Sequence, residues 1–143
     1  LDGVLEAGDA MLEAGAKRVV PLNVSGAWHS ALMEPAIERY RVAVESGTFA
    51  MPSFDVISNV DAQPYRDVAT IRTNLVRSIT HEVRWHETAE KLLSYGLDLV
   101  VEFGASPVLA PLMKRLPDAL EVMNVSDYAG VQKLRARLEG VTA

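Results

Sequence analysis

The chain has 143 residues, of which 49% are hydrophobic and 23% charged, and a formal net charge of −5; these totals predict one globular domain with enough apolar material for a core. Lysine and arginine are not clustered, which argues against a nucleic-acid partner, and no apolar run reaches the roughly 20 residues of a membrane span. The chain has no cysteine, which excludes disulfides, thiolate metal sites and a thiol nucleophile.

The first segment has the pattern of a helix. Its apolar residues share one face at helical spacing: Val4, Leu5, Met11 and Leu12. The chain starts without methionine and without a capping box, which indicates a piece of a longer polypeptide; the alternative is a short disordered tag before it. Asp2 and Glu6 stand where a secretory signal would carry basic residues, so we expect no signal peptide.

Strand and helix patterns alternate along the rest of the chain. Apolar runs predict strands over residues 18–24, 54–58, 97–103 and 120–125. Amphipathic spacing predicts helices over residues 32–45, 71–79, 85–95, 108–116 and 127–138. Pro21 marks the first strand as an edge or a bulge, and Ser126 or Asp127 is predicted to cap the last helix. This alternation predicts an α/β fold with a mostly parallel sheet.

His29 is the first candidate for chemistry. It follows the predicted strand over 18–24, and functional groups in α/β proteins gather at the carboxyl ends of strands. A histidine side chain has an unperturbed pKa of about 6.5, which suits proton transfer at neutral pH. The alternative is a structural loop histidine, which is the commoner use of a lone one.

No second residue completes such a site by spacing alone. His81 and His86 are five residues apart, which does not place two ligands on one helix face, so both are predicted on the surface and no metal site is expected. The stretch "GASPV" over 104–108 matches only the first half of a Gly-x-Ser-x-Gly elbow, and Pro107 lacks the amide that would stabilise an oxyanion. Ser106 is therefore predicted to start a helix.

Four segments, in order, carry a resemblance to a known family. They are "AGAKRVVPLNVSGAWHSALMEPA" (14–36), "DVISNVDAQPY" (55–65), "LVRSITHEVRW" (75–85) and "LVVEFGASPVLAPLMKRL" (99–116). The first resembles the stretch around the active-site histidine of malonyl-CoA:acyl-carrier-protein transacylases, which is close to Gly-Ala-Phe-His-Ser-x-Leu-Met. The last resembles their Glu-hydrophobic-Gly-Pro-Gly-Lys-Val-Leu segment. Together the four segments span nearly the whole chain.

The resemblance implies a two-part fold, of which this chain is the C-terminal half. Residues 1–24 would end a small ferredoxin-like insertion, and residues 25–143 would form the C-terminal part of a larger α/β-hydrolase-like subdomain with a parallel sheet. The family's serine elbow, its substrate-binding arginine and its N-terminal glutamine motif have no counterpart here. They would lie upstream of Leu1.

The resemblance also implies ping-pong acyl transfer from malonyl-CoA to the phosphopantetheine thiol of acyl carrier protein, with no bound cofactor. In that family a serine attacks the thioester while a histidine takes its proton. His29 matches that histidine, so it is the expected catalytic base. The serine is not in this chain, so the chain alone is expected to be inactive.

Other site residues are expected from the same resemblance. Trp28, Ser78 and Val108 would lie at the substrate pocket. Trp28 replaces a phenylalanine whose bulk goes with malonyl over branched groups, and Ser78 replaces a glutamine but keeps the backbone carbonyl that orients the histidine. Two basic pairs are guesses for carrier-protein docking: Lys17 and Arg18, and Lys114 and Arg115.

Three alternatives to a fatty-acid-synthesis enzyme stay open at this stage. The "PVL" run over 107–109 is nearer to polyketide-type acyltransferase domains. The chain could also be a noncatalytic remnant that acts as a binding module, or a proteolytic half held by its own N-terminal half. We expect a cytoplasmic protein that, as an isolated chain, exposes an apolar face and forms a homodimer or aggregates.

Overall fold

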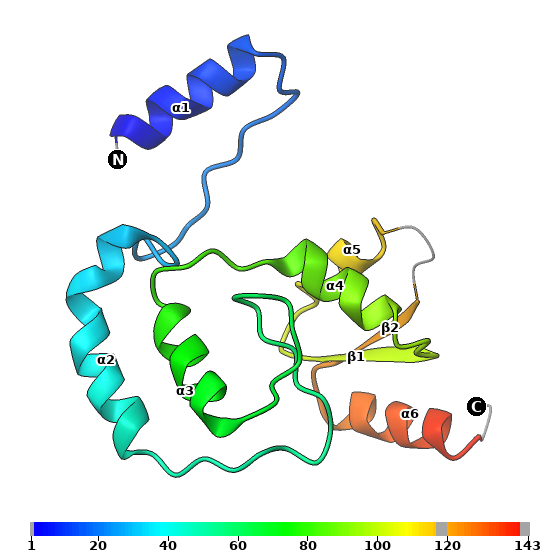
Figure 1. The fold of residues 1–143 in the computed structure, drawn as a ribbon. Coiled ribbons are helices and arrows are strands. Elements are labelled where there is room, and N and C mark those ends of the chain that lie inside the picture. The colour runs from blue at the N-terminus through cyan, green and yellow to red at the C-terminus, as the bar shows by residue number, and fades with distance from the viewer. Residues whose placement is uncertain (1, 117–119, 141–143) are drawn as a thin grey trace.

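The computed structural model describes residues 2–116 and 120–140. Figure 1 shows a small sheet flanked by helices, a further pair of helices to one side of it, and one helix standing apart. The elements in chain order are α1 (Asp2–Glu13), a 3-10 helix (Ala31–Met33), α2 (Glu34–Ser46), α3 (Val68–Arg77), α4 (Trp85–Leu93), β1 (Leu99–Phe103), α5 (Ala110–Met113), β2 (Glu121–Val125) and α6 (Tyr128–Leu138). The α/β class and every predicted helix are therefore confirmed, although α5 is much shorter than predicted.

Strands β1 and β2 form a parallel pair, with α5 in the connection between them. Their register pairs Leu99 with Glu121 and Phe103 with Val125. Helix α6 packs on β2 and begins after Asp127, whose Oδ1 accepts the N–H of Gly130 at 2.8 Å. A side chain at Gly130 would place its Cβ 3.2 Å from the Cα of Val125, so glycine permits this close helix–strand approach.

Two predicted strands do not form. Residues 18–24 form no strand and have no strand partner among the described residues. Val20, Leu22 and Val24 are exposed, with Leu22 at 77%, and Val19 is half-buried. A β-branched run becomes a strand only when another edge satisfies its backbone groups, and Pro21 offers no donor. Over 54–58 there is a single antiparallel bridge, Ile57 to Pro64, which closes a loop instead of extending a sheet.

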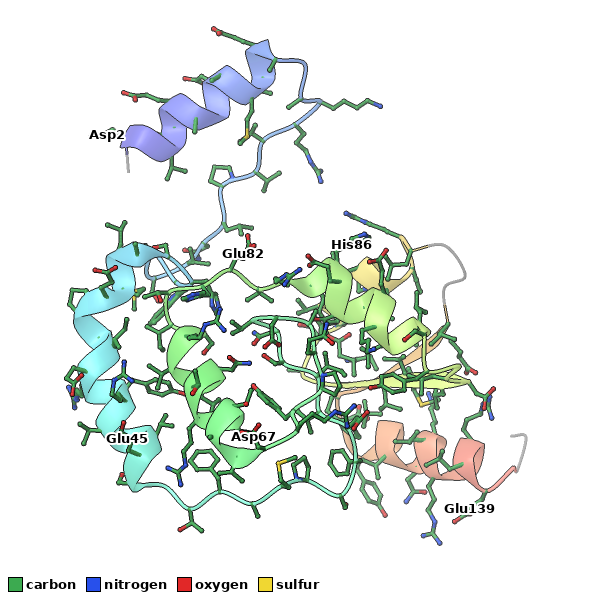
Figure 2. The ribbon with its side chains drawn as sticks, in the orientation of Figure 1. Asp2, Glu45, Asp67, Glu82, His86 and Glu139 are labelled. Atoms are coloured by element: carbon green, nitrogen blue, oxygen red, sulfur yellow. The ribbon has the colours of Figure 1, made fainter. Side chains whose placement is uncertain are left out.

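Helices α2 and α3 pack against each other and run antiparallel. Figure 2 places Glu45, near the end of α2, and Asp67, at the start of α3, at the same end of the pair. Arg72 of α3 donates to the carbonyl oxygens that end α2, including Val44 at 2.8 Å and Gly47 at 2.8 Å. These bonds satisfy carbonyls that a helix terminus leaves unpaired. The far end of α3 therefore lies beside the start of α2.

Helix α1 contributes little to the core. Only Gly8 of this helix is buried, and a side chain there would meet Val19 of the following segment at 3.3 Å. Its apolar face is exposed, with Val4 at 66% and Met11 at 58%. The core itself consists of small and medium side chains: Val44, Val60, Ala62, Val76, Ala89, Ala110, Met113 and Val125.

The expected division into residues 1–24 and 25–143 stays a prediction. Figure 1 shows α1 and the segment after it leading away from the other elements. Leu1 and residues 117–119 and 141–143, which that division includes, lie outside the described residues. No helix in the described part of the chain is long and apolar enough to cross a membrane.

Candidate active site around His29

His29 lies in the turn before the 3-10 helix, and its imidazole has one defined partner. Its Nδ1 lies 2.7 Å from the carbonyl oxygen of Ser78, 49 residues further along the chain. A carbonyl only accepts hydrogen bonds, so Nδ1 carries a hydrogen, and in the neutral imidazole the lone pair is then on Nε2. The side chain is exposed. This tautomer is the one that can take a proton at Nε2.

The backbone around His29 is specialised. His29 has φ 62°, in the left-handed region that side chains rarely adopt. Ser30 Oγ donates to the carbonyl of Ala27 at 2.7 Å, and a side chain at Gly26 would lie 3.5 Å from the ring of Trp28. The indole of Trp28 therefore lies at ordinary van der Waals distance from the Gly26 position, and Trp28 is itself 54% exposed.

Ser78 supplies its backbone carbonyl to His29 while its side chain bonds to its own helix. It is the C-terminal cap of α3, its N–H donates to the carbonyl of Asn74 at 2.9 Å, and its Oγ donates to the carbonyl of Leu75 at 2.7 Å. This hydroxyl is already used within the helix end. The backbone carbonyl of Ser78 is in contact with His29, and its expected role in orienting the imidazole stays a prediction.

A buried polar cluster lies one turn before Ser78. The Nδ2 of Asn74 donates to Ser58 Oγ at 3.1 Å and to Asp61 Oδ2 at 2.8 Å, and both Asn74 and Ser58 are 2% exposed. Burial alone would raise the pKa of Asp61, but the hydrogen bonds from Asn74 and from the N–H of Gln63 outweigh it, so the pKa is lowered. The carboxylate is therefore held ionised.

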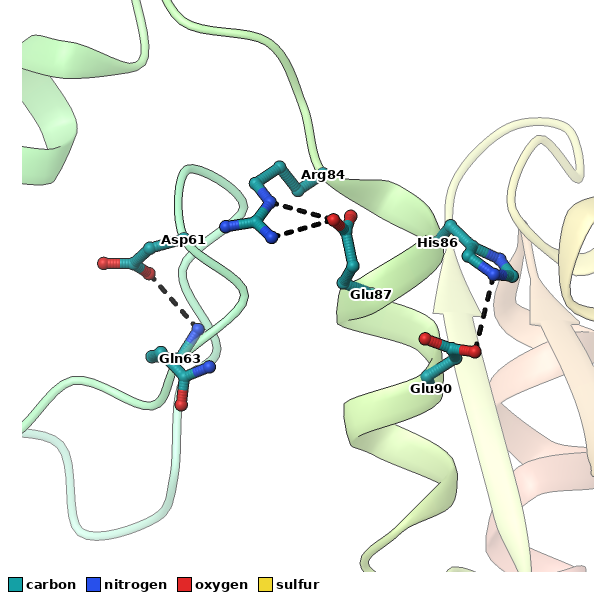
Figure 3. A network of polar contacts seen from close by, with 6 residues as sticks. All are labelled: Asp61, Gln63, Arg84, His86, Glu87 and Glu90. Atoms are coloured by element: carbon teal, nitrogen blue, oxygen red, sulfur yellow. Dashed lines mark hydrogen bonds and ion pairs between the residues drawn. The ribbon is translucent and has the colours of Figure 1, made fainter.

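Arg84 fixes the beginning of α4 beside this cluster. Its Nε and Nη2 both donate to Glu87 Oε1, at 3.0 and 2.8 Å, as Figure 3 shows. The pKa of Arg84 is raised, chiefly by this hydrogen bond to Glu87. His86, on the same helix, reaches Glu90 at 3.4 Å. His81 and His86 are exposed, as predicted.

The loop over 104–109 is organised by Glu102, which the sequence reasoning missed. The carboxylate of Glu102 accepts the N–H groups of Val108 and Leu109 at 2.8 Å and that of Ala110 at 2.9 Å. Ser106 was predicted to start the helix, but the structure corrects this, because α5 begins at Ala110 and Glu102 caps it. Glu102 lies on a strand, so no local capping pattern marks it.

The structure brings together only some of the predicted site residues. His29 and Ser78 are in contact, and Trp28 adjoins His29 in the chain. Val108 lies on the β1–α5 loop and is 63% exposed, and its N–H donates to the carboxylate of Glu102 on β1. The four basic residues are exposed: Lys17, Arg18, Lys114 and Arg115. In residues 2–116 and 120–140 no three His, Asp or Glu side chains form a group that could hold a metal ion.

A parallel strand–helix–strand unit and a loop histidine oriented through Nδ1 define an α/β protein with a candidate general base. No family model matches the chain. The malonyl CoA-acyl carrier protein transacylase of Haemophilus influenzae is 42% identical to it over 117 residues, which are 82% of this chain. That of Bacillus subtilis is 36% identical over 125 residues, or 87% of the chain. The chain belongs to the malonyl-CoA:acyl-carrier-protein transacylase family.

Solved structures give the same result. A malonyl-transacylase in complex with a type II PKS acyl-carrier protein matches with a TM-score of 0.88 and 40% identity, over 97% of this chain and 44% of that one. FabD from Acinetobacter baumannii matches with a TM-score of 0.88, 29% identity and the same coverage. The chain spans about two fifths of its relatives: 38% of the Haemophilus protein and 39% of the Bacillus protein.

Proposed function

We propose that this chain is the C-terminal part of a malonyl-CoA:acyl-carrier-protein transacylase and supplies its catalytic base, His29. The observation that carries the proposal is the 2.7 Å contact between His29 Nδ1 and the carbonyl of Ser78. It holds the proton on Nδ1 and directs the lone pair of Nε2 outward. The relatives' names supply the reaction class.

The reaction needs a serine from outside this chain. His29 Nε2 takes the serine hydroxyl proton as the oxygen attacks the thioester carbon of malonyl-CoA. The tetrahedral intermediate collapses, the C–S bond breaks, and the imidazolium returns the proton to the leaving thiolate. In the second half, Nε2 takes the proton of the carrier's phosphopantetheine thiol as its sulfur attacks the serine ester. The ester C–O bond then breaks, and the imidazolium returns the proton to the serine oxygen.

Substrate and partner follow from the family. Malonyl-CoA and acyl carrier protein are the proposed ligands, in the cytoplasm, with Trp28, Ser78 and Val108 at the pocket. Both basic pairs are exposed and suit an acidic carrier: Lys17 and Arg18, and Lys114 and Arg115. The indole of Trp28 rests over Gly26, which supports a bulky wall that excludes branched acyl groups.

A polyketide-type acyltransferase is the second candidate. The observation in its favour is the match to the malonyl-transacylase solved with a type II PKS carrier protein, at 40% identity. The chemistry at His29 is the same in both, and the difference lies in the carrier protein that accepts the malonyl group. Transfer rates to a fatty-acid carrier and to a type II polyketide carrier, measured side by side, separate the two.

The test is a hybrid in which this chain replaces the matching segment of the Haemophilus influenzae relative. Malonyl transfer from malonyl-CoA to acyl carrier protein is measured for the hybrid and for its His29→Ala variant. We expect the variant to lower kcat/KM by about 10²–10⁴-fold, because general-base catalysis is lost. His86→Ala is the matched control, since His86 is also exposed but has no part in the proposed site.

Three outcomes contradict the proposal. If the His29→Ala hybrid transfers malonyl as fast as the parent hybrid, His29 is not the catalytic base. A parent hybrid that unfolds cooperatively, and so is folded, but transfers no malonyl favours the noncatalytic binding module. A His86→Ala variant as impaired as His29→Ala would also exclude a specific role for His29.

A further inference from the structure

We propose that Asn74, through its bond to Asp61, is a positioning residue that fixes the Ser78 carbonyl and thereby the tautomer of His29. This inference rests on the proposed role of His29 and adds the residues that hold its orienting group in place. Among residues 2–116 and 120–140, no carboxylate bonds to the exposed imidazole of His29, so its orientation depends on the Ser78 carbonyl.

Asn74 connects the turn that contains Ser78 to a neighbouring loop. Its backbone carbonyl accepts the N–H of Ser78 at 2.9 Å, so the two residues are joined across the last turn of α3. Its side-chain Nδ2 uses both hydrogens, toward Ser58 at 3.1 Å and Asp61 at 2.8 Å. Arg77 Nη1 donates to Asn74 Oδ1 at 3.3 Å, so both ends of an amide that is only 2% exposed have partners. The end of α3 is therefore tied to the 58–63 loop.

The 58–63 loop, to which Asn74 connects α3, is held in place by its own hydrogen bonds. The N–H of Ser58 donates to the carbonyl of Gln63 at 2.9 Å, and the N–H of Ala62 donates to the carbonyl of Ser58 at 2.8 Å. Asp61 Oδ1 accepts the N–H of Gln63 at 3.2 Å, which Figure 3 shows. Val60 and Ala62 are buried at 6% and 3% exposure. A loop closed on itself and packed into the core has little freedom to move.

The segment that follows Ser78 is anchored to the same loop. The N–H of Arg84 donates to the carbonyl of Asn59 at 2.8 Å, and the Arg84 side chain is fixed by Glu87 on α4. Residues 78–83 thus run between two attachments to the 58–63 loop, Asn74 on one side and Arg84 on the other. The carbonyl that meets His29 stands at the first of these.

This arrangement has a chemical consequence beyond stability. An exposed histidine keeps one tautomer only while its hydrogen-bond partner stays in place. If α3 loses its tie at Asn74, the Ser78 carbonyl shifts, Nδ1 loses its acceptor, and part of the population moves the proton to Nε2. A base in that form cannot accept a proton at Nε2, and small misplacements of catalytic groups cost rate.

The test uses the full 143-residue chain labelled with ¹⁵N-histidine. Long-range ¹H–¹⁵N spectra report the tautomer of each imidazole, and His86, on α4, serves as the internal reference. We expect the His29 ring nitrogen shifts of the parent chain to be those of the Nδ1–H form. Asn74→Ala and Asp61→Ala should move both shifts toward the averaged values of two exchanging tautomers.

Asn124→Ala is the matched control. Asn124 also donates from Nδ2 to two carbonyls, those of Glu102 at 3.3 Å and Gly104 at 3.4 Å, but it lies on β2, away from residues 78–83. It should leave the His29 shifts unchanged. In the transacylase hybrid, Asn74→Ala should lower kcat by about 10–100-fold with KM for malonyl-CoA unchanged, whereas Asn124→Ala should not.

The inference is overturned if the His29 ring shifts stay unchanged in both Asn74→Ala and Asp61→Ala. It is also overturned if Asn124→Ala changes those shifts equally. Thermal unfolding is measured first; if Asn74→Ala does not unfold cooperatively, Asp61→Ala, whose side chain is less buried, decides. The tautomer readout needs no malonyl transfer. It therefore separates a failure of this inference from an inactive hybrid, which would count against the proposed function alone.

Discussion

The backbone of His29 holds a conformation that its side chain does not favour. A φ of 62° brings Cβ close to the following carbonyl and costs an L-residue roughly 1–2 kcal/mol. Strain of this kind persists where the surrounding structure holds it and often marks a functional site. Here the bond from Nδ1 to Ser78 holds the ring in place from 49 residues away in sequence.

This strain predicts the relative stability of two variants that both lack the imidazole. His29→Gly should have a free energy of unfolding about 1 kcal/mol higher than His29→Ala, because glycine adopts the left-handed region freely. Denaturant unfolding curves of the two proteins check it. At His86, inside α4, the order should reverse, since alanine is the better helix former. Equal stability of the His29 pair would mean that the turn does not hold φ near 62°.

The sequence singled out His29, but it did not point to the Asn74–Asp61 pair behind Ser78 or to the Glu102 carboxylate that organises the 104–109 loop. His29 follows an apolar run and stands in a family-like motif, and both signals are local. Asn74, Asp61 and Glu102 act through contacts with residues 6 to 13 positions away or more, and no spacing rule announces such contacts. The expected role of Ser78 came from the family resemblance alone.

At the scale of elements, helix α5 begins two residues later than its pattern predicts, and the amides at its start are capped by a strand residue. The amphipathic pattern predicted a helix over 108–116, but α5 covers only Ala110–Met113. The N–H groups of Val108 and Leu109 point to Glu102 instead. A carboxylate at this place also complements the positive end of the peptide dipoles. Glu102 thus sets where the loop ends and the helix begins.

Glu102 gives a prediction for pH. The N–H of Leu109, with those of Val108 and Ala110, holds the pKa of Glu102 below its usual value. A lowered folded-state pKa means that the stabilisation is complete above the unfolded pKa of about 4.3 and is lost as pH falls through the folded pKa. Glu102→Gln should therefore lower the Tm at neutral pH and converge with the parent in acid.

The measurement is the Tm of both proteins at steps from about pH 7 to pH 3. The difference between them isolates Glu102, because other carboxyls with lowered pKa, such as Asp61 and Asp67, are common to both. A Tm difference that stays constant with pH would show that the capping charge contributes nothing and that only the shape of the side chain matters.

Helices were easier to predict than strands for a physical reason. A helix such as α4 satisfies its own backbone groups, so its pattern is local. A strand needs a second strand, and residues 18–24 have none in the part of the chain that the structure describes. Residues 97–103 and 120–125 were predicted correctly as β1 and β2, since each supplies the other's partner.

At the scale of the whole molecule, many large apolar side chains are exposed, whereas the core consists of small and medium ones. Large apolar side chains at the surface include Leu32 at 79%, Phe54 at 71% and Phe103 at 71%. Patches of this kind drive association. The relatives are more than twice as long as this chain. The exposed side chains fit the proposal that this chain packs against further polypeptide, either its own N-terminal half or a second copy.

Helix α1 offers a test of how the chain divides. It is exposed along its length except at Gly8, and that residue meets Val19 of the adjoining segment instead of the main body. A chain of residues 25–143 should therefore keep the unfolding midpoint of the full chain when both are heated and followed by circular dichroism. Because the deletion also removes the exposed side chains of Leu22 and Val24, sedimentation should show weaker self-association. A Tm lower by more than about 5 °C, equivalent to about 1 kcal/mol for a chain of this size, would mean that residues 1–24 stabilise the main body and that the boundary lies elsewhere.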